Sequence, residues 1–312
     1  MKFAIIGAGV MGGLVGAMLS KAGAEVWLVN KNEEITEAIR KNGLEVKIQD
    51  RDEQFTLNAV KSSAEILQKM DVLIFLVKGY QTEAAAVAAQ SLADGHTYIM
   101  TLQNGIGNVE ILAKYYDPDK ILYGILEFAG KMLVPGHIQA LIGENSKICF
   151  GPASKVITEE MNKIEAYFIK SGLKIIFKAD IDSEVWIKLR NNSTNALFGL
   201  LRQSMGQALS IPDTQEMMSL IRNEVIAVAQ AKGIQFSPDE LQVNQGKTPI
   251  NPELYAHLPS TAQDIKNKKP TEIEFLNGAI YREGLKVGVP TPYNELLYKM
   301  VTILENTYDV QF

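Results

Sequence analysis

A glycine-rich loop near the start of the chain constrains the fold more than any other feature of the sequence. The loop directly follows the short apolar run Phe3–Ile6, which is typical of a buried strand. A helix-like segment, Leu14–Ala22, and a second strand-like run, Glu25–Val29, come next. This is the strand–turn–helix setting in which a G-x-G-x-x-G loop holds a dinucleotide pyrophosphate against a helix N-terminus. The cofactor-binding residues that it predicts are Gly7, Gly9, Val10, Met11 and Gly12.

The same segment also has features of a secretory signal peptide, because Lys2 precedes a mostly apolar stretch that ends in Ala22-Gly23-Ala24. Three observations favour the dinucleotide loop instead. The loop glycines interrupt the apolar stretch, and Lys21 lies just before the supposed cleavage site. The second strand also completes a βαβ unit only if the first strand is retained. With one cysteine, Cys149, and no disulfide possible within the chain, we expect a cytoplasmic protein.

Length and charge limit the remaining function classes. At 312 residues the chain is long enough for two domains. The net charge is −5, with both signs interspersed and no basic stripe, so we expect no nucleic-acid partner. No apolar stretch reaches the ~18 residues of a membrane span, so we expect no membrane partner. The three histidines, at positions 96, 137 and 257, lack metal-ligand spacing, and we expect no metal site.

Strand-like and helix-like segments alternate through the first half of the chain, which predicts right-handed crossovers and a mostly parallel sheet. The further strands expected in this sheet are Val72–Val77, Thr97–Thr101 and Ile121–Leu126. The helices expected between strands are Glu33–Lys41, Thr82–Ser91 and Gly107–Lys114. Leu44–Lys47 and Gln54–Ala59 are candidates for a short ribbon insertion. A second strand set follows, with a helix near Thr158–Lys170: Ile138–Leu141, Lys147–Phe150 and Lys174–Phe177.

The strand signal stops after Lys178, and the rest of the chain is predicted to be helical. Its long amphipathic segments are Ser183–Arg202, Asp213–Lys232 and Gln263–Lys286. The predicted fold class is therefore α/β, with an N-terminal Rossmann-type doubly wound sheet followed by an all-helical domain. We expect a dinucleotide-binding domain over residues 1–180 and a substrate-binding domain over residues 181–312. Long amphipathic helices in the second domain are compatible with a homodimer.

Two polar residues follow neighbouring strands of the predicted sheet. Lys78 comes after Val72–Val77, and Asn104 lies in the turn after Thr97–Thr101. Taken alone, Lys78 is equally well explained as a solvated loop lysine, and Asn104 as part of an ordinary Asn-Gly turn. Ligands of open α/β sheets bind beyond the carboxyl ends of the strands, so the two together indicate a ligand crevice.

The first predicted helix of the second half carries an unusual polar stripe. Lys188, Asn191, Asn192 and Asn195 are spaced at i, i+3, i+4 and i+7, so a continuous helix places them on one face. Asparagine is a poor helix former, and a solvated face more often carries Glu, Lys or Gln. The stripe therefore indicates a pocket lining. Glu272 is a second candidate, although a carboxylate near a helix N-terminus also stabilises the helix dipole.

The chain resembles the ketopantoate reductase family over nearly its whole length. The resemblance rests on the glycine loop, Lys78, the Gln103-Asn104-Gly105 turn and several later motifs. Those later motifs are Pro135-Gly136-His137, Trp186-Ile187-Lys188-Leu189, Ser260 with Gln263-Asp264, Thr271–Gly278 and Gly288–Asn294. The order and spacing of Ser260, Asp264 and Glu272 are specific to this pattern.

The resemblance implies a role for each matching residue. Lys188 matches the catalytic lysine that protonates the developing alkoxide, and Glu272 matches the carboxylate that binds substrate and supports that lysine. Lys78 and Asn104 match groups that line the crevice for cofactor and substrate, and Ser260 matches a ligand of the substrate carboxylate. The implied reaction adds a nicotinamide hydride to a 2-oxo acid and yields the D-hydroxy acid. A nearby ammonium suits this chemistry, because the ketone oxygen gains negative charge as the hydride arrives.

The chain departs from the family pattern at a few positions. The family places asparagines four and eight residues after the lysine. Here Asn192 occupies the first of these positions, but the second holds Ala196, and the nearest amide is Asn195. His257 replaces another common asparagine. These changes favour a D-2-hydroxyacid dehydrogenase of the D-mandelate type, acting on branched or aromatic 2-oxo acids. The alternative is 2-dehydropantoate 2-reductase, the enzyme of pantothenate biosynthesis.

The end of the second strand bears on the choice between NAD(H) and NADP(H). The family often has an arginine there for the NADP 2′-phosphate, and this chain has Asn30 and then Lys31 in the matching place. Both cofactors remain open, and loss of the arginine favours NAD(H) slightly. A non-catalytic dinucleotide sensor is a further alternative. Retention of Lys188 and Glu272 argues against it, since a sensor does not need an acid.

Overall fold

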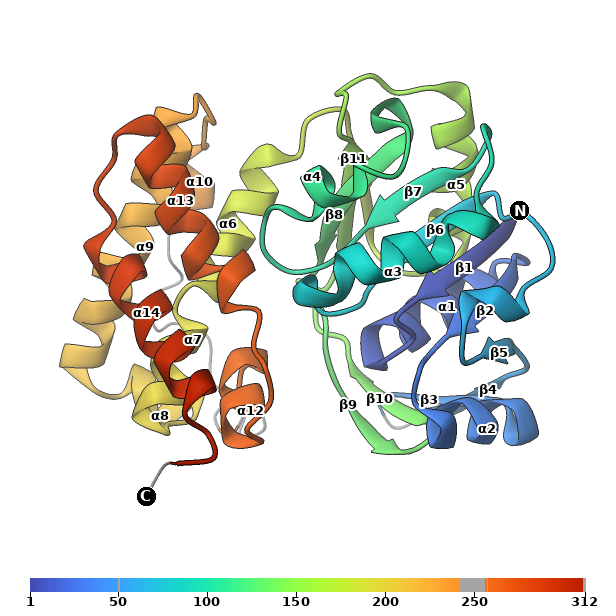
Figure 1. Ribbon diagram of the computed structural model, residues 1–312, viewed down its shortest axis with the longest axis horizontal. Helices are drawn as coiled ribbons and strands as arrows, with labels where there is room; N and C mark the ends of the chain where they lie inside the picture. Colours follow the sequence, from blue (N-terminus) through green and yellow to red (C-terminus); the bar gives the residue numbers. More distant parts are fainter. Residues whose placement is uncertain (50, 242–255, 257, 311–312) are drawn as a thin grey trace. The chain divides into compact units, whose positions relative to one another are not determined.

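The computed structural model describes residues 1–49, 51–241, 256 and 258–310 (Figure 1). The chain divides into two compact units. Residues Met1–Gln103 and Asn108–Ile181 form the first, which we call the sheet unit. Residues Asn104–Gly107 and Asp182–Phe312 form the second, the helical unit. The chain therefore leaves the sheet unit for only four residues, directly after Gln103, and returns to it before its final exit.

Within the described residues, the sheet unit is built on an eight-stranded sheet with the order β12-β11-β8-β7-β6-β1-β2-β5. Its strands are β1 (Lys2–Ile6), β2 (Glu25–Val29), β5 (Asn58–Val60), β6 (Val72–Phe75), β7 (Tyr98–Thr101), β8 (Ile121–Leu126), β11 (Ile148–Pro152) and β12 (Ile175–Phe177). Neighbouring strands are parallel except for β8 and β11. The strand order reverses between β1 and β6, and such a switch point is where open α/β sheets bind ligands.

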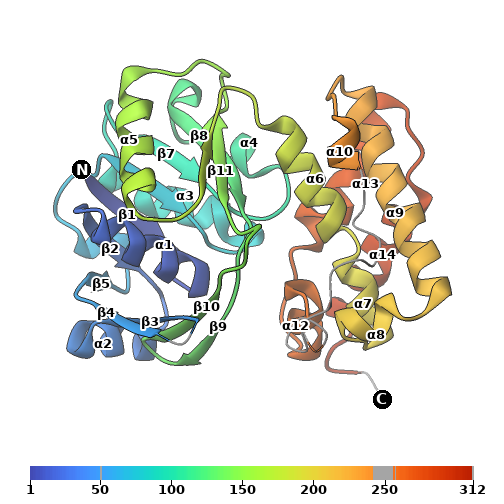
Figure 2. The same cartoon turned by 180° about the vertical axis from the view of Figure 1, so that it is seen from behind.

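Helices cover both faces of this sheet, as Figures 1 and 2 show from opposite sides. One apolar core joins the sheet to α1 (Val10–Lys21) and α5 (Glu159–Lys170). A second core, on the other face, joins it to α3 (Thr82–Ala89) and α4 (Asn108–Leu112). The predicted doubly wound architecture is therefore confirmed. The remaining helix of the unit is α2 (Glu33–Asn42), and its short 3₁₀ turns are η1 (Ser63–Glu65), η2 (Gly79–Gln81), η3 (Gln90–Leu92) and η4 (Pro118–Lys120).

A second, four-stranded sheet packs against α1 from the side away from the main sheet. Its order is β4-β3-β10-β9, with β3 (Leu44–Ile48), β4 (Arg51–Phe55), β9 (Ala129–Val134) and β10 (His137–Leu141). A Cβ at Gly16 would lie 2.5 Å from the Leu28 side chain of β2, whereas one at Gly13 would lie 3.2 Å from Ile138 of β10. The helix α1 is thus enclosed between two sheets, which explains why it lacks a polar face.

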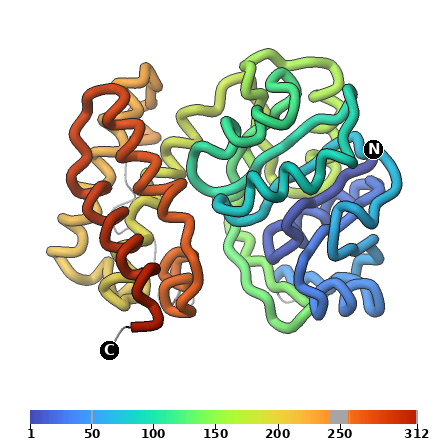
Figure 3. The backbone as a smooth tube through the Cα atoms, in the orientation of Figure 1, coloured from blue at the N-terminus to red at the C-terminus, as the bar shows by residue number. Residues whose placement is uncertain are grey.

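This small sheet corrects three sequence expectations. The ribbon expected from Leu44–Lys47 and Gln54–Ala59 is present as the antiparallel β3–β4 pair, but it ends at Phe55, and the rest of the second segment begins β5, which joins the main sheet. The expected second strand set is divided, because Ile138–Leu141 pairs with β3 in the small sheet, whereas Lys147–Phe150 and Lys174–Phe177 correspond to β11 and β12 of the main sheet. Strand β9 was not predicted. Figure 3 shows the chain returning here, after more than 80 residues, to run beside β3.

The helical unit consists of helices and one 3₁₀ turn in its described residues. They are α6 (Asp182–Asn192), α7 (Asn195–Leu201), α8 (Met205–Leu209), α9 (Pro212–Ala231), α10 (Pro238–Leu241), α12 (Ser260–Lys266), η5 (Ile273–Phe275), α13 (Asn277–Val287) and α14 (Pro292–Asn306). Two apolar clusters hold them together. Among the helices of the described residues, none is long and apolar enough to cross a membrane.

Two helices that the sequence predicts as continuous are broken. The segment Ser183–Arg202 divides into α6 and α7, because the Ser193 hydroxyl donates to the Arg190 carbonyl (2.8 Å) and the Thr194 hydroxyl donates to the Asn191 carbonyl (3.0 Å). Such side-chain bonds compete with the helical ladder. The segment Gln263–Lys286 divides into α12, η5 and α13, and Pro270 lies between the first two.

Candidate functional site

Two glycines of the N-terminal loop are required by close packing of the backbone. Gly7 has a φ of +102°, and a Cβ there would lie 2.5 Å from the Val77 backbone nitrogen. A Cβ at Gly12 would lie 2.5 Å from the Gly7 carbonyl oxygen. No L-residue fits either position without displacing β6 or the loop itself. The loop is thus held tightly between β1, β6 and the start of α1.

Gly9 has a different environment. It is exposed, and a Cβ there would meet nothing within 4 Å. It is the N-cap residue of α1, has no side chain to cap the first turn, and no acidic residue lies in that turn. Val10 and Met11, the first two helical residues, are half-buried. The loop therefore has open space beside the uncapped N-terminus of a twelve-residue helix, an arrangement that fits a phosphate group.

Asn30 and Lys31 follow β2 at the same edge of the sheet. The Asn30 amide donates to the Ala8 carbonyl (2.8 Å) and accepts from the Asn32 backbone N–H (2.9 Å). Asn30 therefore connects the glycine loop to the turn that begins α2. Lys31 is exposed, and its ammonium forms no ion pair or hydrogen bond with the described residues.

A buried polar network fixes the ends of β6 and β7. Gln103, which is 7% exposed, donates from Nε2 to the Val77 carbonyl (2.8 Å) and to the Thr82 hydroxyl (2.7 Å). Its Oε1 accepts from the Thr101 hydroxyl (2.9 Å), and Thr82 in turn donates to Asn108 (2.9 Å). Sequence reasoning treated Gln103 only as a turn residue. The position of its amide, between a buried strand and an Asn-Gly turn, was the feature of the sequence that could have indicated this role.

Lys78 directly follows this network on the β6 side. Its backbone is extended, with φ −61° and ψ 142°, and it precedes the 3₁₀ turn η2. Its side chain is half-buried and has interaction partners within the structure. The sequence prediction of a lysine held at a strand end is consistent with this position.

In the helical unit, the segment Asn104–Gly107 is fixed against η5. Gly105 has a φ of +80°, and a Cβ there would lie 2.1 Å from the Phe275 carbonyl oxygen. The next residue, Ile106, donates its backbone N–H to that same carbonyl (3.0 Å). Glu272 precedes η5 and is 5% exposed, and its carbonyl accepts the backbone N–H of Phe275 (2.9 Å). The Asn104 segment and Glu272 are thus both anchored to the backbone of Phe275.

The helix α6 joins this arrangement through Asn192. The Asn192 amide donates from Nδ2 to the Asn104 side-chain oxygen, at 3.5 Å. Lys188 lies one helical turn before Asn192 and is half-buried. The structure therefore brings together, within one unit, the Asn104 segment, the α6 face that bears Lys188, and the turn that bears Glu272.

Two amides of the predicted stripe are not part of this group. The break at Ser193 and Thr194 ends α6, so Asn195 starts α7 and is 8% exposed, and the expected single face ends at Asn192. Asn191 is exposed, and its Oδ1 accepts weak contacts (3.4 Å) from Arg190. Burial lowers the pKa of the Arg190 guanidinium below its usual value. Ser260 begins α12, which packs against α7.

A second buried network holds the α6–α7 turn in place. Asn277, which is fully buried, donates from Nδ2 to the Ser193 carbonyl and to the Asn294 side-chain oxygen, each at 2.9 Å. Asn294 donates to the Glu224 carboxylate (2.6 Å), which also accepts the backbone N–H groups of Tyr293 and Asn294 at the start of α14. The matching motifs around residues 277 and 294 therefore contain structural amides.

Two family models match the chain, one described as "Ketopantoate reductase PanE/ApbA" over residues 3–155, and one as its C-terminal counterpart over residues 180–305. The chain belongs to the ketopantoate reductase family. The resemblance inferred from the sequence motifs is confirmed, and with it the assignment as an oxidoreductase with a Rossmann-like fold.

Curated relatives and solved structures of this family match over nearly the full chain. The 2-dehydropantoate 2-reductase of Aquifex aeolicus (strain VF5) is 31% identical over 98% of this chain and 97% of its own. The enzyme of the same name from Lactococcus lactis subsp. lactis is 30% identical over 96% and 97%. The ternary structure of a D-mandelate dehydrogenase with NADH and anilino(oxo)acetate is 31% identical in sequence, with a TM-score of 0.89. The match covers 99% of this chain and 100% of that chain.

Proposed function

We propose that the chain is a 2-dehydropantoate 2-reductase, which reduces the ketone of ketopantoate with a hydride from a nicotinamide dinucleotide. The names of the curated relatives support this function. From the sequence alone this function was the alternative, and it now replaces the D-2-hydroxyacid dehydrogenase that the residue spacing favoured.

The helix break weakens the argument for the earlier preference. That preference rested on Asn195 being displaced by one position on a continuous helix, and on His257. Because α6 ends at Asn192 and α7 begins at Asn195, counting along one helix does not locate the second amide. His257 lies outside the described residues. Neither departure therefore supports a pocket without polar contacts to a substrate hydroxyl.

The glycine loop fits the dinucleotide. Gly9 provides open space beside the uncapped N-terminus of α1, and Gly7 and Gly12 keep the backbone close enough to form the turn. When bound, the dinucleotide supplies the hydride. Lys31, an exposed point charge with no partner among the described residues, is a weak ligand for a 2′-phosphate, which supports a slight preference for NAD(H).

The helical unit supplies the groups for proton transfer and substrate binding. In this proposal, Lys188 gives its proton to the ketone oxygen as negative charge develops there. Glu272 supports the lysine and binds substrate, and Asn104 and Asn192 bind the substrate beside them. The observation that carries the proposal is the 3.5 Å contact between Asn192 and Asn104, one helical turn from Lys188. Residues 1–180 would then bind the dinucleotide, and residues 181–312 the substrate.

A D-2-hydroxyacid dehydrogenase remains the second candidate. It is favoured by the structural match to D-mandelate dehydrogenase, at a TM-score of 0.89 and 31% identity. The two functions differ in the substrate tail rather than in the reacting group. A site that hydrogen-bonds the hydroxymethyl group of ketopantoate rejects substrates without it by a large factor.

A substrate panel distinguishes these candidates. We expect kcat/KM for ketopantoate to exceed the values for benzoylformate and 2-oxo-4-methylpentanoate by more than tenfold, measured with both NADH and NADPH, and we expect a D-hydroxy acid product. The reverse ranking supports the second candidate. Binding of a dinucleotide without turnover of any 2-oxo acid identifies a sensor instead.

A homodimer through α14 completes the proposal. Its exposed face carries an apolar stripe at i, i+3, i+7 and i+10, made of Tyr293, Leu296, Met300 and Ile303, which are 41–63% exposed. Such a stripe is self-complementary across a two-fold axis. Light scattering should show a dimer that Met300→Glu converts to a monomer, and a monomeric wild type at micromolar concentration contradicts this part of the proposal.

A further inference from the structure

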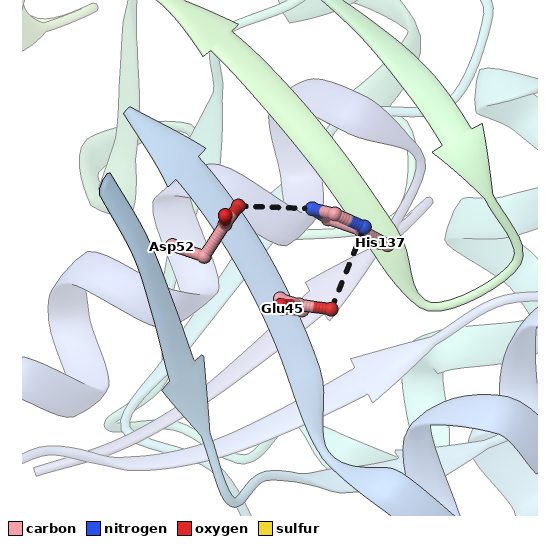
Figure 4. Close-up of side chains that lie close together, drawn as sticks. All are labelled: Glu45, Asp52 and His137. Atoms are coloured by element: carbon pink, nitrogen blue, oxygen red, sulfur yellow. Dashed lines mark hydrogen bonds and ion pairs between the residues drawn. The ribbon is translucent and has the colours of Figure 1, made fainter. Parts of the chain in front are cut away.

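Three potential metal ligands lie together on the outer face of the small sheet, as Figure 4 shows. Glu45 is on β3, Asp52 on β4 and His137 on β10. In the strand register, His137 is opposite Glu45, and Asp52 is opposite Lys47, two residues along β3. Residues that alternate along β3 point to one face, so all three side chains are on the same side of the sheet. The spacing of 45, 52 and 137 in the sequence gives no indication of this group.

The distance between His137 Nε2 and Asp52 fits two ligands of one metal ion. His137 Nε2 is 3.2 Å from Asp52 Oδ1, and His137 Nδ1 is 3.4 Å from Glu45 Oε2. The Nε2–Asp52 contact is a hydrogen bond, longer than the ~2.7–2.9 Å of a charge-assisted one. The Nε2–Asp52 separation is also close to the edge of a zinc coordination tetrahedron, which is about 3.3 Å for the usual Zn–N and Zn–O bond lengths. One ligand atom from each of the three residues lies within 4.8 Å of the other two.

We propose that this cluster binds a divalent transition-metal ion of the zinc class. His137 Nε2 and one Asp52 oxygen are the direct ligands, and water completes the coordination shell. Glu45 accepts a hydrogen bond from Nδ1 of the same imidazole, which fixes the tautomer that leaves Nε2 free to coordinate. A carboxylate behind a ligating histidine is the usual outer partner at such sites. Imidazole and carboxylate together suit Zn²⁺ better than Mg²⁺ or Ca²⁺, which prefer oxygen ligands.

The surrounding charges set an upper limit on the affinity. The same face of the sheet carries Lys47, opposite Asp52, and Lys131 on β9, opposite Gln139. The two lysines offset the two carboxylates, and the three proposed binding residues are partly open to water, with side-chain exposures of 22–46%. We therefore expect binding in the micromolar range. Removing the nearer positive charge, as in Lys47→Gln, should strengthen binding severalfold.

The position of the site indicates a structural effect rather than a catalytic one. The ion would connect the β3–β4 hairpin to β10, which enters the sheet from a distant part of the sequence. This sheet packs on α1 through Leu44 and Ile138. Bound metal should therefore raise the stability of the folded sheet unit by mass action. This site is independent of the proposed reductase function.

Calorimetric titration of EDTA-treated, full-length protein with ZnCl₂ tests the site. We expect one equivalent of Zn²⁺ to bind, with at least 20-fold weaker binding in both His137→Gln and Asp52→Asn, and about 10–100-fold weaker binding in Glu45→Gln. The control is His96→Gln, because His96 is an exposed histidine away from the small sheet. This variant should bind zinc with the affinity of wild type. Circular dichroism checks that each variant is folded, and Asp52→Asn, at an exposed position, tests the site if His137→Gln does not fold.

A thermal unfolding series gives a second readout. Zinc at a concentration well above the measured Kd should raise the melting temperature of wild type and His96→Gln, but not that of His137→Gln or Asp52→Asn. The proposal is wrong if wild type binds no zinc below millimolar concentration. It is also wrong if His137→Gln keeps wild-type affinity, or if His96→Gln loses it.

Discussion

Gly105→Ala should damage the site without replacing any residue proposed to contact substrate or cofactor. In the native chain a Cβ at this position would lie 2.1 Å from the Phe275 carbonyl oxygen, whereas ordinary contacts begin near 3.4 Å. The Asn104 segment and η5 must therefore separate by more than 1 Å. A left-handed φ of +80° adds about 1–2 kcal/mol for alanine. Overpacking adds a further 1–3 kcal/mol or so, which gives a loss of about 2–5 kcal/mol in the free energy of unfolding.

The same displacement should lower catalysis. Asn104 precedes Gly105, and Glu272 is bonded through its carbonyl to Phe275, so both move when the contact opens. A misplacement of about 1 Å costs on the order of 100-fold in rate, and we expect that loss in kcat/KM for ketopantoate. The matched control is Gly233→Ala, because Gly233 has a φ of +85° but nothing within 4 Å of its Cβ position. That variant should lose only about 1–2 kcal/mol and keep its activity. If Gly105→Ala behaves like Gly233→Ala in urea unfolding and in turnover, the reasoning from the contact is refuted.

Three further predictions concern stability and cofactor choice. Asn294→Ala removes the buried side-chain hydrogen bonds to Glu224, Ile221 and Asn277, although Glu224 keeps its two backbone donors. Urea unfolding should show a loss of about 3 kcal/mol, and a loss below 1 kcal/mol contradicts this role. Burial and the nearby Arg190 lower the pKa of Arg222, and its Nε is buried without a partner among the described residues. Arg222→Met should therefore stabilise the fold by about 1 kcal/mol in urea unfolding, and a destabilised variant contradicts this expectation. The ratio of kcat/KM for NADPH over NADH should stay below tenfold in wild type, and Lys31→Ala should lower only the NADPH value, so an equal effect on both cofactors would remove Lys31 from the site.

The sheet unit could be predicted closely because its strands are short apolar runs separated by helices. The expected strand Glu25–Val29 is β2 and Ile121–Leu126 is β8, with the same bounds. The helix after the glycine loop begins at Val10, four residues earlier than expected, because the last loop glycine is already inside the helix. Strand β9 is half exposed and contains Gly130 and Lys131, so its sequence lacks the apolar pattern of a strand.

The helical unit was less predictable, because tertiary contacts decide where its helices end. Periodicity alone shows no break at Ser193 and Thr194, whose hydroxyls bond to backbone carbonyls and whose buried turn is bound by Asn277. The residue pattern singled out Lys188 and Glu272 as candidates, and the family resemblance gave each of them a role. It did not reveal that Gly105 fixes the Asn104 segment to η5, since that contact depends on a backbone approach across nearly 170 residues of sequence.

The central claim is that Lys188 supplies the proton to the reduced ketone. The most direct test compares wild type with Lys188→Ala in steady-state reduction of ketopantoate, with dinucleotide affinity measured separately by fluorescence. We expect a loss of roughly 10²–10⁴-fold in kcat with nearly unchanged dinucleotide affinity, the scale typical of a missing general acid. A variant that keeps kcat within a few-fold of wild type would show that the proton comes from another group.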